Sequence, residues 1–140
     1  MTHREVQGIT LAEKHKDTVR LSEDGEQTTV FNKINWIVET YPAHNSLKYT
    51  FHAPNGGWRG KGEAARFKAM GVSRGFPDIA NPIIKFAIEM KVGYNKATQE
   101  QFDWLIALQS AGWKVGIAYS ARDAYDFLME WLNIPAEYFE

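Results

Sequence analysis

The sequence predicts a single α/β domain in which helices flank a mixed β-sheet. Three observations indicate this fold class. The chain has 140 residues, 44% of them hydrophobic and 14% aromatic, which is enough for one core and too few for two full domains. Apolar residues recur at helical spacing in some segments and alternate at strand spacing in others. Glycine and proline mark where these segments end.

The first half of the chain contains three predicted elements. Val30, Ile34 and Ile37 have the spacing of an amphipathic helix, which we expect to begin after Ser22 and to end at Pro42. Residues 47–54 alternate and are rich in strand-forming residues, so they predict a first strand. A short helix is expected over residues 60–71.

The second half contains five more predicted elements. Residues 77–80 and 84–92 predict two strands joined near Asn81, and Thr98 opens a helix with a capping-box spacing to Gln101. Residues 113–120 alternate as another strand, and Ser120 caps a last helix that ends before Pro135. The expected order is α-β-α-β-β-α-β-α, and a mixed sheet with helices on both sides would bury the apolar faces.

We expect the core domain to span residues 22–132, with an N-terminal extension or arm over 1–21 and a tail over 133–140. The polar N-terminal segment leaves a short helix, an arm and partial disorder all open. The chain has no cysteine, which excludes disulfides and thiolate metal sites. The N-terminus is too charged for a signal peptide and no apolar run is long enough to cross a bilayer, so we expect a cytoplasmic protein without membrane contact.

Charge is distributed unevenly along the chain, although the net charge is only −1. Residues 51–100 carry eight Lys/Arg against four acids, whereas the last forty residues carry two against six. Because phosphate affinity depends on locally clustered cations, this pattern is compatible with one DNA-facing side. A solvated basic face would show the same pattern.

The apolar stretch 75–93 carries Asp78, Glu89 and Lys91 among its charged side chains. Glu89 and Lys91 would share one face of a strand, and Asp78 on the neighbouring strand can bring a second carboxylate beside Glu89. A buried Glu–Lys salt bridge is the simpler interpretation. Two converging carboxylates, however, repel unless one is protonated or a cation holds them, and oxygen ligands favour Mg²⁺ or Mn²⁺. A metal beside a lysine ammonium suits phosphodiester hydrolysis.

These residues resemble the signature of PD-(D/E)XK nucleases: Pro77-Asp78, then after ten residues Glu89-Met90-Lys91. The surrounding segments SEDGEQ, HAPNGG, AARFKAMGVSRGFPDI and ATQEQFDWLIALQSAGWKVGIAYSARDA resemble the VRR-NUC subfamily, particularly its small stand-alone members from phages and bacteria. The resemblance covers roughly residues 22–132 and implies a restriction-endonuclease-like core.

The resemblance also implies an activity: a Mg²⁺-dependent endonuclease, with Mn²⁺ as a substitute and no organic cofactor, acting as a homodimer on branched DNA such as four-way junctions. Phage DNA resolution, repair and replication are all compatible with it. Asp78 and Glu89 would be metal ligands, Lys91 the catalytic lysine, and the main-chain carbonyl of Met90 a further ligand. An acid of the first helix would complete the metal shell; Glu26 matches best, with Glu23 as the alternative.

Gln101 matches a glutamine of the family that lies near the active site or touches the phosphate. Both Gln101 and Glu26 have a structural alternative, since a capping box explains the first and the helix dipole favours the second. Residues expected near DNA are polar or basic and fall in the middle of the chain: Asn55, Gly56, Arg59, Lys61, Arg66, Lys68, Arg74 and Lys96. A tight turn and an exposed amphipathic helix would explain the same residues.

Two rival functions remain open at this stage. The domain is either an inactive DNA-binding relative of the nucleases or a sequence-specific nuclease of the restriction type. The presence of both carboxylates and the lysine favours activity. Reading base edges usually requires extra recognition loops, for which 140 residues leave little room.

Overall fold

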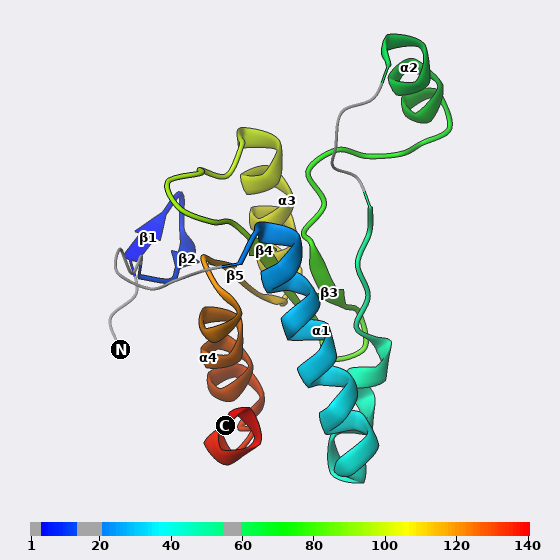
Figure 1. Ribbon diagram of the computed structural model, residues 1–140. Helices are drawn as coiled ribbons and strands as arrows, with labels where there is room; N and C mark the ends of the chain where they lie inside the picture. The colour runs from blue at the N-terminus through cyan, green and yellow to red at the C-terminus, as the bar shows by residue number, and fades with distance from the viewer. Residues whose placement is uncertain (1–3, 14–20, 55–59) are drawn as a thin grey trace.

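A computed structural model describes residues 4–13, 21–54 and 60–140 of the protein (Figure 1). Its described strands form one five-stranded mixed sheet in the order β1-β2-β5-β4-β3. The strands are β1 (Arg4–Val6), β2 (Ile9–Leu11), β3 (Ile79–Asn81), β4 (Phe86–Met90) and β5 (Lys114–Ala118). The α-helices are α1 (Glu23–Thr40), α2 (Lys61–Ala69), α3 (Gln99–Ser110) and α4 (Ala121–Leu132), with 3₁₀ segments η1 (Pro42–Tyr49) and η2 (Ala136–Phe139). The predicted α/β class with a mixed, helix-flanked sheet is confirmed.

Strand β4 is an inner strand of the sheet and is buried along its whole length. It pairs in parallel with β5, with Glu89 opposite Ile117, and antiparallel with β3, with Ile79 opposite Ile88. Helices α1 and α4 pack against each other on one face, where the Phe127 ring of α4 fills the space in front of Gly116. Helix α3 packs on the other face against β2, β4 and β5. A buried strand sandwiched between helices explains why β4 is almost entirely apolar.

Helix boundaries follow local signals that the sequence displays. The side chain of Ser22 accepts a hydrogen bond from the Gly25 amide and caps α1, which ends just before Pro42 as expected. Thr98 and Gln101 form the predicted reciprocal capping box at the start of α3. Gly112 follows α3 at φ 94°, a conformation that glycine adopts without strain.

The predicted strand over residues 47–54 is wrong. Residues 42–49 form the 3₁₀ segment η1, and only Phe51 makes an isolated bridge, to Ala80. The alternating apolar side chains do not form a buried face: Tyr49 and Phe51 are 49% and 42% exposed, and only Leu47 is buried. The observed order therefore lacks the strand that we placed between the first two helices.

Residues 4–11 form an antiparallel hairpin that joins the sheet, β2 lying parallel to β5. Gln7 and Gly8 make its turn with φ values of 54° and 81°, the left-handed pair typical of a tight hairpin. Ile9 and Leu11 are buried in the core. This part of the predicted arm is thus a component of the sheet.

Helix α2 stands away from the sheet (Figure 1). The predicted helix over residues 60–71 is confirmed, and Gly71 follows it at φ 90°. None of its residues is buried. Within the described ranges, no helix has both the length and the apolar character needed to cross a bilayer.

Candidate active site

Asp78 lies immediately before β3, beside the end of β4. The main-chain amide of Met90 donates a 2.9 Å hydrogen bond to its Oδ2 atom, which fixes the carboxylate against the strand that carries Glu89. Because β3 and β4 form a short antiparallel pair, Asp78 and Glu89 come together as the sequence predicted. Oδ2 of Asp78 thus has a structural role in addition to any role in binding a ligand.

Glu89 is a carboxyl group in an unfavourable place. It is 2% exposed, and its Oε2 atom is buried with no hydrogen-bond partner among the described residues. The pKa of Glu89 is raised from 4.5 to about 11, mainly by burial and also by the neighbouring Asp78 carboxyl, against the lowering effect of Lys91. Asp78 lies close enough to share a hydrogen bond with Glu89 once a proton is present. Without a cation, the pair is stable only with one proton between them.

Lys91 lies two residues beyond Glu89 and is 9% exposed. Its main-chain amide donates to the Ala118 carbonyl at 2.8 Å, which continues the pairing of β4 with β5. The Lys91 ammonium lowers the pKa of both Glu89 and Glu23, so it lies within electrostatic reach of these two carboxylates. Asp78, Glu89 and Lys91 are therefore brought together near the C-terminal end of β4.

Gln101 serves two purposes in the structure. Its Oε1 atom accepts from the Thr98 amide at 2.8 Å in the capping box, and its Nε2 atom donates to Oε1 of Glu89 at 3.5 Å. Helix α3 also lies very close to Gly75, where a Cβ atom would be 2.8 Å from the main chain of Glu100. The turn that leads to Asp78 thus packs directly on the first turn of α3.

The first-helix acid nearest to this group is Glu23. Burial raises its pKa, Lys91 lowers it and Asp78 raises it, and Glu23 in turn contributes to the high pKa of Glu89. Glu26 is buried one turn further along α1, and among the described residues its charge acts on Tyr125 of α4. Of the two acids that the sequence left open, the structure favours Glu23.

His52 is a neighbour of the site that the sequence did not reveal. Its Nδ1 atom lies 2.7 Å from the main-chain carbonyl of Asp78. A carbonyl oxygen can only accept, so Nδ1 carries the proton. Asp78 is therefore held at both ends, its carbonyl by His52 and its carboxylate by the Met90 amide. A side-chain bond to a main-chain atom leaves no signature in a sequence.

The donor set fits a hard divalent cation. No group of three or more His, Asp or Glu side chains within the described ranges is arranged as a ready-made metal cage. Mg²⁺ seldom uses such cages; it binds through one or two carboxylates and takes its other ligands from water and phosphate. The partnerless Oε2 of Glu89 beside Asp78 has the chemistry of such a ligand.

The residues predicted to contact DNA are placed unevenly. Lys61, Arg66 and Lys68 are exposed on α2, Arg74 is exposed in the turn that follows, and Lys96 is exposed between β4 and α3. Asn55, Gly56 and Arg59 lie outside the described residues.

Together, the mixed sheet, the acid pair and the adjacent lysine are consistent with a nuclease fold of the PD-(D/E)XK type. Among solved structures, the protein is similar to a chain described as a VRR_NUC domain protein, with a TM-score of 0.64, 27% identity, and coverage of 83% of this chain and 92% of that one. No protein-family model and no curated protein matches the sequence significantly. The motif order and the structural likeness agree, and both support a VRR-NUC domain.

Proposed function

We propose that the protein is a divalent-metal-dependent endonuclease that hydrolyses phosphodiester bonds in branched DNA such as four-way junctions. The observation that carries this proposal is the buried, partnerless Oε2 of Glu89 next to a second carboxylate and a lysine. A purely structural role would leave this costly arrangement unexplained, since an apolar residue at position 89 would pack in the same strand without penalty.

Each residue has a chemical role in the proposal. Asp78 and Glu89 would hold Mg²⁺ or Mn²⁺, with the Met90 carbonyl as a further ligand and Glu23 as the acid that completes the metal shell. The bound cation would neutralise phosphate charge and acidify a water molecule. Lys91 orients the attacking water and stabilises the negative charge that grows on the phosphate oxygens. Gln101 steadies the Glu89 carboxylate through its amide.

Selection of branched DNA is supported by the kind of contact that the exposed cations can make. A reader of base sequence presents several side chains to base edges in a groove, whereas a reader of shape needs mainly phosphate contacts. The exposed cations of α2 and Arg74 can supply such phosphate contacts. A four-way junction has two-fold symmetry, so a homodimer with one site per subunit can make paired incisions.

The test is cleavage of end-labelled four-way junctions and linear duplexes of the same sequence, in Mg²⁺ or in EDTA. We expect junction cleavage in Mg²⁺ only, and a loss of at least about 100-fold in Lys91→Ala and Asp78→Asn. Lys114→Ala is a matched control, because Lys114 is exposed at the opposite end of the paired strands β4 and β5. Cleavage in EDTA, or unchanged rates in both active-site variants, would refute the proposal.

Assembly has its own measurement. Size-exclusion chromatography with light scattering is expected to give twice the mass of one 16.0 kDa chain. A strict monomer that still makes paired incisions would exclude the dimeric arrangement while leaving the chemistry intact.

A further inference from the structure

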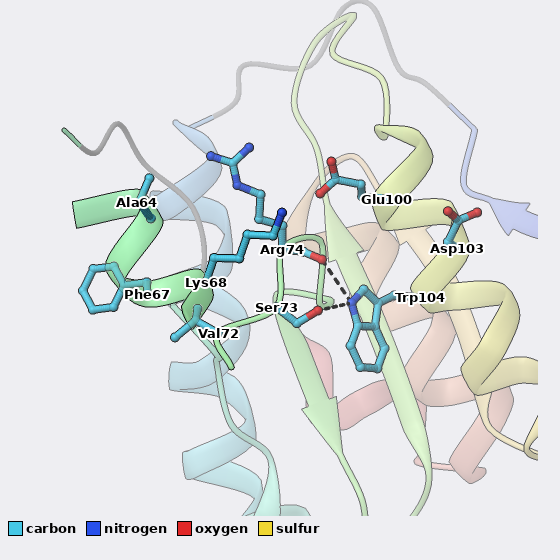
Figure 2. A pocket seen from close by; sticks show the side chains of 10 residues that line it. Ala64, Phe67, Lys68, Val72, Ser73, Arg74, Glu100, Asp103 and Trp104 are labelled. Carbon is cyan, nitrogen blue, oxygen red and sulfur yellow. Dashed lines mark hydrogen bonds between the residues drawn. The ribbon is translucent and has the colours of Figure 1, made fainter. Parts of the chain in front are cut away.

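A groove of about 670 Å³ lies between α2 and the first half of α3 (Figure 2). Lys68 and Arg74 extend toward the gap from the α2 side, and Glu100, Asp103 and Trp104 of α3 form the opposite wall (Figure 2). The groove thus has cations on one side, and an aromatic ring with two carboxylates on the other.

This groove adjoins the candidate active site. Arg74 is four residues before Asp78, and Glu100 directly precedes Gln101, whose amide reaches Glu89. The tight contact of Gly75 with the Glu100 main chain joins the two walls beside the acid pair. A strand whose phosphate lies at the acid pair would therefore have its neighbouring nucleotide near the groove.

Trp104 is held in one orientation within the groove. Its Nε1 atom donates to Ser73 Oγ at 3.2 Å and to the Arg74 carbonyl at 3.0 Å (Figure 2). The Phe76 ring meets it edge to face, with centroids 5.0 Å apart at 82°. The indole remains partly exposed on the groove wall. An indole fixed in this way can stack on a ligand without losing further rotamer freedom.

The combination of groups selects the ligand. An aromatic face stacks on a base, cations bind the flanking phosphates, and carboxylates accept hydrogen bonds from the amino groups of a base. A paired base in a duplex hides its faces in the helical stack, so only an unpaired nucleotide can offer all three features at once. The volume matches that of a site for a small ligand and does not suit a double helix.

Helix α2 supports the same conclusion. It has nine residues with none buried, and an isolated helix of that length is marginal in water. Phosphates bound by Lys61, Arg66 and Lys68 would stabilise the helix. Its basic side chains therefore favour a polyanionic partner.

We propose that this groove binds an unpaired nucleotide of a DNA strand beside the scissile phosphate. The inference rests on the proposed nuclease function and deepens it, since it names the feature of branched DNA that the enzyme recognises: bases that have left the stack.

Binding of a fluorescent 12-nucleotide single strand is measured by anisotropy in EDTA, where no cleavage occurs. We expect Kd to rise about 5-fold to 100-fold in Trp104→Leu and to rise also in Lys68→Ala. Trp36→Leu and Lys48→Ala are matched controls, because both positions are exposed and lie outside the groove, and Kd is expected to stay within about twofold. Lys68 is exposed on a helix that has no buried residue, so we expect Lys68→Ala to keep the fold even if Trp104→Leu does not.

Junction cleavage in Mg²⁺ by the wild-type protein completes the experiment. If the junction is cut but Trp104→Leu and Lys68→Ala bind single strands as tightly as the wild type, the groove proposal is overturned and the nuclease function stands. If no DNA is cut while Kd still depends on Trp104 and Lys68, the groove binds unpaired nucleotides as proposed and the nuclease function fails.

Discussion

Replacing Glu89 with Gln should stabilise the metal-free protein while abolishing its response to metal. The wild-type side chain buries a carboxyl whose Oε2 has no partner, and a buried unsatisfied polar atom costs about 1–3 kcal/mol. With a pKa of about 11, the Glu89 carboxyl binds a proton when the protein folds at pH 7.5. This pH is three units above 4.5, the ordinary pKa of the group. The linkage cost of that proton has an upper limit of about 4 kcal/mol. Glutamine has no proton to take up, so we expect a gain of about 1–4 kcal/mol.

The sign of the pH dependence follows from the direction of the shift. Because the pKa of Glu89 is raised in the folded state, its carboxyl contributes most favourably to the unfolding free energy below pH 4.5. That contribution is lost as the pH rises toward 11. Urea unfolding in EDTA at pH 6 and pH 8 should therefore show the advantage of Glu89→Gln growing with pH. Adding Mg²⁺ or Mn²⁺ should raise the unfolding free energy of the wild type only. A variant that is less stable than the wild type at pH 8 in EDTA would refute the reasoning.

Three further predictions concern the groups around the acid pair. Gly75→Ala should lower the unfolding free energy by about 2–5 kcal/mol, because it adds a backbone clash to left-handed strain. Gly71→Ala, with open space around it, should lower the unfolding free energy by only about 1–2 kcal/mol. Equal losses in the two variants would exclude the close contact between Gly75 and the Glu100 main chain. His52→Asn, which keeps a donor at the Nδ1 position, should cut DNA several-fold faster than His52→Gln in single-turnover assays. The reverse order would show that the important donor of His52 is Nε2. Glu23→Gln should slow single-turnover cleavage at least about tenfold and Glu26→Gln less than about twofold, and the opposite result would restore Glu26 as the helix acid.

The juxtaposition of Asp78, Glu89 and Lys91 could be predicted because these residues are close in sequence. Glu89 and Lys91 are two positions apart on one strand, and a short connection brings Asp78 beside them. The capping box of Thr98 and Gln101 was equally accessible, since it depends on a spacing of three residues. Local geometry fixes such pairs before any tertiary contact is formed.

Features that depend on distant packing were missed. Strands β1 and β2 have three residues each, too few to show a period, and β2 finds its partner β5 near the other end of the chain. The alternation of residues 47–54 was misleading because no second layer covers its apolar side chains. In both cases burial, which the sequence does not report, decided the outcome.

The choice between Glu23 and Glu26 shows the same limit within a helix. Both are acids in the first turn of α1, where the helix dipole favours either. Which of them approaches the acid pair depends on how α1 is rotated against the sheet. That rotation is set by the packing of Val30, Ile34 and Ile37, each 1% exposed or less.

The position of a bound Mn²⁺ ion tests the proposed metal centre most directly. Crystals of the protein soaked in Mn²⁺ are expected to show one anomalous peak between the Asp78 and Glu89 carboxylates, at a distance of about 2.0–2.3 Å from an oxygen of each. Soaked crystals of Glu89→Gln should lack this peak. A peak elsewhere, or none in the wild type while Glu89 keeps its buried position, would contradict the metal-dependent nuclease assignment.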